Sequence, residues 1–348
     1  MFLSSLNCSV TDECSIVEAN SFNFNFIYFG LIALFSFAGL VLNLISVFIL
    51  TIAIDTKNNF FQLLNHFTLN SLAINILELT SSIIYISIPQ YVYEIPNLEN
   101  HNLDLYCDNY EAVFYMIYIY FSMRQVLFLF AGVFDIIIVY ERVQLYNPKW
   151  KTFLAAKPAI QLSFYVMLFC LFINFSGFFA RRIDTKTIFI IDNNRTVLVH
   201  AYRNSEYSYK KIYNWFLFAS NFIKDIFTLI FEIFINILLI LALKVYRKQK
   251  TRLQRTVLKK RSIFTKEDLG MVKTALLLSF FSAILHLFNF GTFLAKQFDT
   301  TPNQIYYILI GILGSLLILI RHSINFFIFL NFNKRFQTEF YKIFGLQK

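Results

Sequence analysis

Long apolar runs separated by short polar segments dominate the pattern of this chain. Seven of the runs, near residues 26–53, 62–90, 112–140, 158–179, 213–243, 270–295 and 304–330, exceed the length of about 20 residues that an α-helix needs to cross a bilayer. Runs this long without alternation exclude the strands of a β-barrel, and irregular backbone cannot face lipid. The pattern predicts an all-α membrane protein, built as a seven-transmembrane helix bundle.

Composition supports the same class of protein. Of the 348 residues, 57% are hydrophobic and only 15% are charged, which leaves a soluble fold too little polar surface to cover its core. Residues 331–348 repeat phenylalanine at every fourth position, with basic residues between. This spacing predicts a short amphipathic helix after helix seven that lies along the membrane surface.

The distribution of Lys and Arg predicts which loops face the cytoplasm. Residues 54–61, 142–157, 244–273 and 331–348 together hold 20 of them, whereas the loops on the opposite side hold 8. Basic loops stay on the cytoplasmic side, so we expect the N-terminus outside and the C-terminus inside. The chain then divides into an extracellular segment 1–25, a transmembrane bundle 26–330 and a cytoplasmic segment 331–348, in the plasma membrane.

The most basic of these segments, 244–273, holds 11 Lys and Arg residues. In a soluble protein such a run would indicate nucleic-acid binding, but here it connects two membrane helices. We therefore expect anionic lipids of the inner leaflet as its partner, and no nucleic acid.

Polar residues inside the spans recur at helical spacing, which predicts that they face other helices. On helix three, Arg124, Asp135 and Arg142 are separated by 11 and 18 residues, so they lie within about 20° of one line. The residues expected in the polar core are Asn43, Asn75 and Asp135. The candidates for a ligand pocket are Glu78, Arg124, Asp225, His286 and Asn289.

Two of these side chains carry alternative interpretations. The cation of Arg124 could hold the carboxylate of an acidic ligand or peptide, or Glu78 could neutralise it as a structural pair. His286 could be a metal ligand, a proton switch, or a hydrogen-bonded histidine of the bundle. The five histidines form no cluster in the sequence, so no metal or cofactor is expected. No nucleophile or phosphate-loop pattern appears, which excludes an enzyme.

The expected outer segments carry cysteines and glycosylation sequons. Cys8, Cys14 and Cys107 lie in these segments. Asn7 and Asn194 each begin an Asn-x-Ser/Thr sequon, which agrees with the predicted orientation.

Four motifs fall at places that resemble the rhodopsin-like (class A) family of G protein-coupled receptors. They are Gly39-Leu-Val-Leu-Asn43 in helix one, Leu69-Asn-Ser-Leu-Ala-Ile-Asn75 in helix two, Glu141-Arg142-Val143 at the inner end of helix three and His322-Ser-Ile-Asn325-Phe-Phe-Ile-Phe329 at the end of helix seven. The last of these is most similar to invertebrate neuropeptide-type and chemosensory receptors.

The resemblance implies a receptor function. An extracellular peptide or small chemosensory molecule would shift the bundle between two packings, and a heterotrimeric G protein would bind its inner face. The residues that the resemblance implies for coupling and activation are Glu141, Arg142, Asn325 and Phe329.

The chain also departs from the family pattern. Asn75 replaces an aspartate, Phe326 a proline and Phe329 a tyrosine. Residues 180–212 contain no cysteine that could tie the second outer loop to helix three, so Cys8 or Cys14 is the expected partner of Cys107. A seven-span ligand-gated channel and a transporter are the alternative functions.

Overall fold

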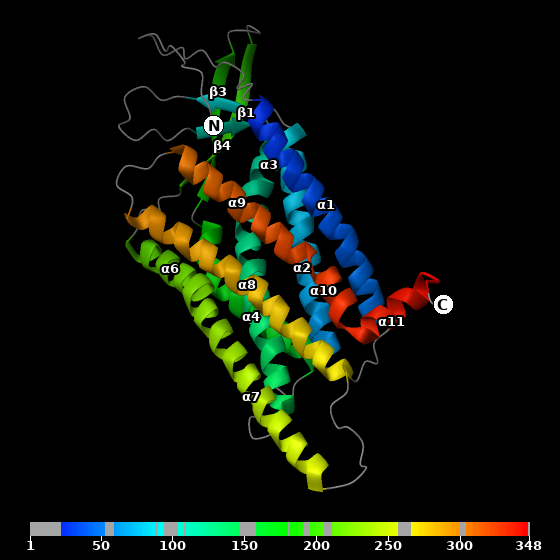
Figure 1. The fold of residues 1–348 in the computed structure, drawn as a ribbon. Helices are drawn as coiled ribbons and strands as arrows, with labels where there is room; N and C mark the ends of the chain where they lie inside the picture. Colours follow the sequence, from blue (N-terminus) through cyan, green and yellow to red (C-terminus); the bar gives the residue numbers. More distant parts are fainter. Residues whose placement is uncertain are drawn as a thin grey trace.

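The computed structural model describes residues 22–52, 59–87, 90–93, 104–107, 109–146, 158–179, 181–190, 195–204, 211–256, 266–298 and 304–346. Its long helices form one bundle (Figure 1). The α-helices are α1 (Phe22–Ile52), α2 (Asn59–Ser87), α3 (Tyr110–Phe114), α4 (Ser122–Tyr146), α5 (Ala159–Asn174), α6 (Lys211–Asn221), α7 (Thr228–Thr256), α8 (Lys266–Phe298), α9 (Gln304–Ser323), α10 (Asn325–Phe332) and α11 (Lys334–Ile343).

Within the part of the chain that the structure describes, three short stretches of other helical types continue the α-helices. Two are π-helices, η1 (Tyr115–Phe121) between α3 and α4 and η6 (Phe222–Phe227) between α6 and α7. The third, η4 (Phe175–Phe179), is a 3-10 turn that ends α5. π-helical turns inside α-helices occur frequently at functional sites, which makes the surroundings of η1 and η6 the first place to look for one.

Within the described residues, six helices are long and apolar enough to cross a membrane. They lie over Tyr28–Ile52, Asn59–Ser87, Ala159–Phe179, Phe218–Tyr246, Leu269–Gly291 and Leu313–Phe332. The chain is therefore a multi-pass membrane protein. The third predicted run forms the continuous helical stretch α3–η1–α4, which is not one of the six; α4 contacts α2, α5, α7 and α8 and so lies at the centre.

The exterior of the bundle carries many large apolar side chains. Leu34 on α1, Phe172 on α5 and Phe234 on α7 are 63%, 76% and 53% exposed. Leu129 and Phe134 of α4, by contrast, are completely buried. Continuous apolar surface of this kind faces lipid, since a soluble monomer rarely exposes it to water.

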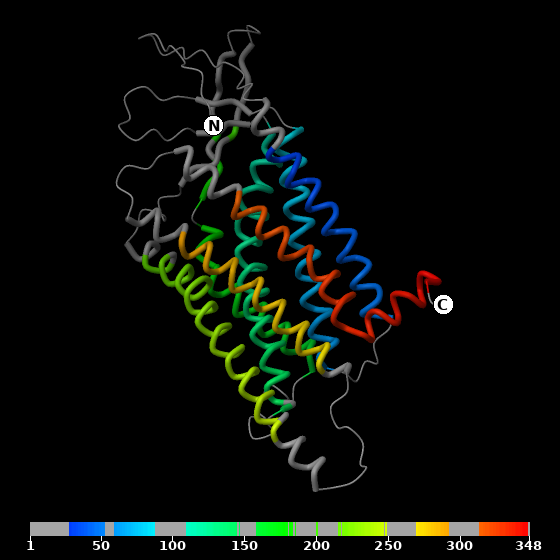
Figure 2. Tube along the Cα trace, viewed as in Figure 1, coloured from blue at the N-terminus to red at the C-terminus, as the bar shows by residue number. Residues whose placement is uncertain are grey.

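The helix ends agree with the predicted runs, with two exceptions. α7 continues to Thr256, past the predicted end at residue 243, because the basic segment keeps good helix formers. The seventh predicted run is divided in two: α9 ends at Ser323 and α10 begins at Asn325. Figure 2 follows these two segments down the bundle toward the C-terminal helix.

A four-stranded antiparallel sheet, which the all-α prediction did not contain, covers one end of the bundle. Its strands β1 (Gln90–Tyr93), β2 (Asp104–Cys107), β3 (Arg181–Ile190) and β4 (Arg195–Asn204) lie in the order β1-β2-β4-β3. The two loops that the sequence placed on the outer side therefore meet, through β2 and β4. We call this the sheet end and the opposite end the α11 end (Figure 1).

At the α11 end, α8 and α10 approach each other at a glycine. A Cβ atom at Gly270 would lie 2.2 Å from the backbone carbonyl oxygen of Phe332. The side chain of Asn333 caps α11 by accepting a hydrogen bond from the backbone N–H of Phe336, at 3.1 Å. The turn between α10 and α11 is thus fixed against the start of α8.

Replacing Gly270 by alanine should therefore destabilise the fold, because the backbone of Phe332 must move to admit the methyl group. We expect a cost of about 1–3 kcal/mol, the range for overpacked sites. The measurement is the melting temperature of the purified protein in detergent, which should fall by several degrees. Gly30→Ala is the matched control, since nothing lies within 4 Å of the added Cβ in the described structure; equal melting temperatures would contradict the prediction.

Candidate functional site

The predicted coupling pair lies at the α11 end, where α4 finishes. Arg142 is buried, and its Nε donates to Oε2 of Glu141 at 2.6 Å. Its guanidinium also lies over the ring of Phe60 on α2, 3.8 Å from the centroid, and Nη1 lies 3.7 Å from Sδ of Met271 on α8. Arg142 therefore connects three helices at this end of the bundle.

One of the three residues predicted for the polar core, Asn43, joins a set of hydrogen bonds between α1, α2 and the junction of α9 with α10. Asn43 donates to the carbonyl oxygen of His322 at 2.9 Å. Asn325 donates to Ser71 Oγ at 3.0 Å, and Ser71 Oγ is also 3.0 Å from Nδ1 of His322. These contacts bring together Asn43 and Asn325, which the sequence placed in different spans.

Asn75 and Phe329 differ in their surroundings. The amide of Asn75 is buried and makes no hydrogen bond within the described part of the chain. It lies against Gly39, where an added Cβ would be 2.8 Å from it and 2.2 Å from Ser323 Oγ. Phe329 is fully buried and packs its ring on Phe336 of α11, with centroids 5.6 Å apart. Because Gly39 has no side chain, α1 can pack closely against α2 and α9 at this position.

An extended set of buried charges occupies the middle of the bundle. Asp135 of α4 forms an ion pair with Arg321 of α9, and both are almost completely buried. Nη2 of Arg321 donates to Ser282 Oγ on α8 at 3.0 Å, and Ser282 Oγ donates to Oε1 of Glu232 on α7 at 2.6 Å. We call Asp135, Glu232, Ser282, His286 and Arg321 the charge network; it links four helices.

His286 joins this network at a longer distance. Its Nε2 lies 3.9 Å from Glu232 Oε1, and its Nδ1 lies 3.8 Å from Asp225 Oδ1 on η6, too far for direct hydrogen bonds. A Cβ at Gly132 would lie 2.9 Å from His286 Nε2, so α4 can pass this ring only with a glycine there. In the described residues, no cluster of His, Cys, Asp or Glu could hold a metal ion.

Arg124 is engaged by the carboxylate that the sequence offered as its structural partner. Its Nε lies 2.5 Å from Oε1 of Glu78, and the hydroxyl of Tyr120 donates to Oε2 of the same carboxylate at 2.9 Å. The guanidinium also lies 5.5 Å from the ring centroid of Phe128. This geometry favours the structural pair, since both carboxylate oxygens and the cation have partners. Asn289, the remaining candidate, is half-buried on α8.

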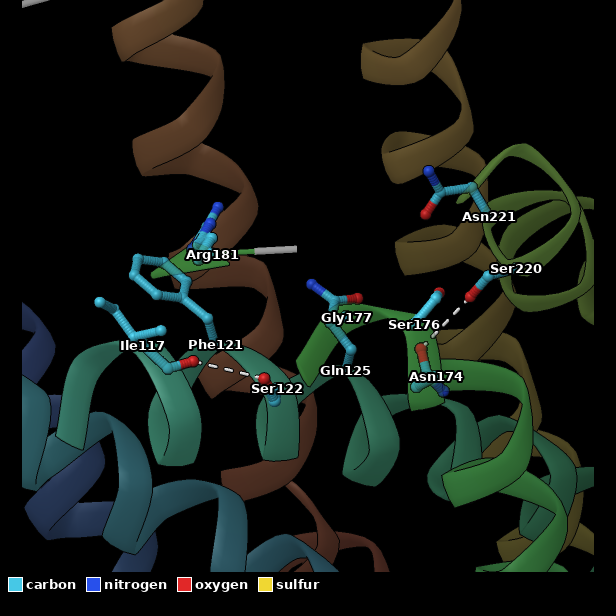
Figure 3. A pocket seen from close by; sticks show the side chains of 10 residues that line it. All are labelled: Ile117, Phe121, Ser122, Gln125, Asn174, Ser176, Gly177, Arg181, Ser220 and Asn221. Atoms are coloured by element: carbon cyan, nitrogen blue, oxygen red, sulfur yellow. Dashed lines mark hydrogen bonds between the residues drawn. The ribbon is translucent and has the colours of Figure 1, made fainter. Parts of the chain in front are cut away.

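A pocket of about 170 Å³ opens among the described residues near the sheet end (Figure 3). η1 and the start of α4 form one wall, and the end of α5 with η4, the start of β3 and the end of α6 form the others. Its polar lining includes Gln125, Asn174, Ser176, Arg181 and Asn221. None of the ligand-pocket candidates from the sequence lines it, although Lys224, next to Asp225, donates to Gln125 Oε1 at 2.6 Å.

Arg321, Glu232 and the residues that line this pocket were not among the site residues predicted from the sequence. Arg321 carried a usable signal, because a charge inside an apolar run needs a partner of opposite sign at the same depth. No such signal in the sequence marked the pocket, since its lining residues come from separate helices and a strand that meet only in the folded chain. Asn7, Cys8, Cys14 and Asn194 lie outside the described residues, and so does the side chain of Cys107.

No family model matches this chain, and no curated protein matches its sequence. The functional assignment therefore depends on the contacts described above.

Proposed function

We propose that the chain is a G protein-coupled receptor of the rhodopsin-like class. In this proposal the stretch α3–η1–α4 also crosses the membrane, as the third span in chain order, and brings the total to seven. The sheet end then faces the cell exterior and the α11 end faces the cytoplasm. The excess of Lys and Arg in the loops of the α11 end, 20 against 8, supports the orientation. The sequons at Asn7 and Asn194 then lie where glycosylation occurs.

The observation that carries the proposal is the position of Arg142. A buried arginine at the cytoplasmic end of the central helix is costly unless its charge is compensated, and Glu141 compensates it at 2.5 Å. The same guanidinium contacts α8 through Met271 and α2 through Phe60. Movement of α8 away from α4 would break these contacts and expose the arginine to a Gα subunit.

The charge network connects the pocket near the sheet end with the middle of the bundle. Lys224 contacts the pocket lining through Gln125 and lies 3.9 Å from Asp225, which in turn is 3.8 Å from His286. From His286 the contacts continue through Glu232 and Ser282 to Arg321. A ligand that repositions Lys224 could thus change the packing of α4, α7, α8 and α9, the helices that must move for coupling.

The amphipathic helix α11 supports a membrane-surface position at the cytoplasmic end. Phe336 is buried against the bundle, whereas Phe344 is 49% exposed and available to lipid. Arg335 lies over the ring of Phe61 at 5.5 Å, and Lys342 is largely exposed. Basic residues on such a helix fit anionic headgroups of the inner leaflet.

A transporter or ligand-gated channel is the second candidate, and the charge network is the observation that favours it. Ionisable groups in a row inside a membrane bundle are typical of proton and ion pathways. Current recordings separate the candidates: a channel or electrogenic transporter would carry a current that is absent from cells without the chain, whereas a receptor would signal without one.

Recruitment of Gα tests the receptor proposal. In cells that express a promiscuous Gα chimera, Arg142→Ala should remove basal and ligand-evoked recruitment by the wild-type chain, because the exposed arginine is the proposed contact with Gα. Arg335→Ala, an arginine stacked on α2 at the same end, is the matched control and should retain most of the signal. Equal signal from Arg142→Ala and wild type, at equal surface staining, would overturn the proposal.

A further inference from the structure

Glu232 of α7 is a completely buried carboxyl group that no cation contacts in the described part of the chain. The hydroxyl of Ser282 donates to its Oε1 at 2.6 Å, whereas its Oε2 has no hydrogen-bond partner among the described residues. The ionisable side chain that approaches it is His286, whose Nε2 lies 3.9 Å from Oε1. An ionised carboxylate here would have lost its water and gained no opposite charge, which is very costly.

The cations of the surrounding described residues are already engaged by other carboxylates. Arg321 forms its ion pair with Asp135, and Nζ of Lys224 lies 3.9 Å from Oδ2 of Asp225. The two cations therefore face three carboxylates once Glu232 is included. The negative charge of Asp135 also opposes a second negative charge in the same network.

Other charged and titratable groups near the network do not supply the missing positive charge. Arg124 has its own carboxylate, Glu78. His322 lies with Nε2 3.3 Å from Nη1 of Arg321, so a proton on its ring would be repelled by the guanidinium. The groups that face Glu232 from the packed elements are thus Asp135 on α4, Lys224 and Asp225 on η6, His286 on α8, and Arg321 and His322 on α9.

A proton on His286 would be one way to compensate the remaining charge, but the geometry opposes it. Nδ1 of His286 lies 3.8 Å from Oδ1 of Asp225, and neither atom has a hydrogen-bond partner within the described residues. Nε2 is 3.9 Å from Glu232. Both N–H groups of an imidazolium would be too far from these carboxylates for hydrogen bonds. A proton on the carboxyl of Glu232 instead removes the buried charge itself.

We propose that Glu232 is a proton-binding site, with its carboxyl group protonated at neutral pH. The carbonyl oxygen is Oε1, which accepts the hydrogen bond from Ser282, and the proton is on Oε2, the oxygen without a partner. Movement of α7 away from α8 would separate Glu232 from Ser282 and admit water, so the carboxyl would release its proton. The packing of these helices is then coupled to proton uptake and release. The proposal goes beyond the receptor function and does not depend on it.

Infrared spectroscopy of the purified chain in dodecyl maltoside, a detergent without carbonyl groups, tests the proposal without any G protein. A protonated carboxyl absorbs at higher wavenumber than carboxylate or amide groups, and its band shifts in D₂O. The wild type should show this band at neutral pH, and Glu232→Gln should remove it. Glu339→Gln, which replaces a glutamate paired with Lys342 on α11, is the matched control and should retain it.

A second variant keeps the test informative if Glu232→Gln folds poorly. Ser282→Ala removes the hydrogen bond to Oε1, so the band should remain and move to higher wavenumber. A wild-type spectrum without the band, or the same band in the wild type and in Glu232→Gln, would overturn the proposal. Loss of Gα recruitment in cells would leave it intact, since the band is measured on the chain alone.

Melting temperatures give an independent readout. Glutamine resembles a protonated glutamate, so Glu232→Gln should melt close to the wild type at neutral pH. Glu78→Gln makes the same substitution at an equally buried carboxylate, but it leaves Arg124 unpaired and should lower the melting temperature by several degrees. Equal losses in the two variants would contradict the proposal.

The pH dependence of stability follows from the same proton. The folded chain keeps a proton that an exposed glutamate of the unfolded chain loses in mildly acidic solution, so stability falls as the pH rises. Between about pH 5 and pH 8 the melting temperature of the wild type should therefore fall more than that of Glu232→Gln. Parallel curves for the two proteins would show that Glu232 binds no proton in this range and would overturn the proposal.

Discussion

Replacing Arg321 by alanine is expected to remove most of the folded protein. The change leaves the buried Asp135 carboxylate, which is 0% exposed, without its cation, and it removes a donor to Ser282. Breaking a buried ion pair on one side costs about 3–5 kcal/mol, a large fraction of the stability of most proteins. The measurement is the melting temperature in detergent together with surface expression, and both should fall sharply.

The companion variants identify the cause of the loss. Asp135→Leu combined with Arg321→Leu removes both charges, and should recover much of the stability that Arg321→Ala loses. Lys342→Ala breaks the ion pair with Glu339 on α11, where the lysine side chain is 69% exposed, and should cost less than about 1 kcal/mol. A melting temperature of Arg321→Ala equal to that of Lys342→Ala would contradict the burial of the Asp135 pair.

Replacing Glu141 by alanine is expected to raise basal signalling. Arg142 would remain buried against Met271 and Phe60 without its carboxylate, so the closed packing of α4 on α8 would lose stability. A hydrogen bond to a charged group contributes about 1.5–3 kcal/mol, which corresponds to a shift of about ten- to a hundredfold in the equilibrium between closed and open packings. Ligand-free Gα recruitment, normalised to surface staining, measures it.

Glu339→Ala is the matched control for this prediction, since Glu339 pairs with a lysine of its own helix at 3.7 Å. Its basal signal should equal that of the wild type. If Glu141→Ala and Glu339→Ala give the same basal recruitment, the pair does not hold the receptor closed, and Arg142 is a structural residue.

Local information in the sequence was enough to predict the membrane helices and to suggest two of the ion pairs. Each membrane helix satisfies its own backbone, so an apolar run predicts it without knowledge of its neighbours. Glu141 and Arg142 are adjacent, and Glu78 and Arg124 lie at similar depths in consecutive long helices. The pair with Glu78 was one of the two interpretations of Arg124, and both pairs are present.

The contacts that determine the candidate sites are long-range, and a single sequence does not contain the rotation of one helix relative to another. Asp135 and Arg321 are separated by 186 residues, and Arg181 reaches its pocket from a strand. The sheet was not predicted, although β3 and β4 are rich in Thr, Ile and Val, residues that favour strands.

The orientation of the chain in the membrane tests the central claim most directly, since Gα can reach Arg142 only if the α11 end is cytoplasmic. Epitopes placed at the N-terminus and after Lys348 would be stained on intact and on permeabilised cells. The receptor account predicts that the N-terminal epitope stains on intact cells and the C-terminal epitope only after permeabilisation. The opposite pattern would place Arg142 outside the cell, contradict coupling to a G protein and favour the channel.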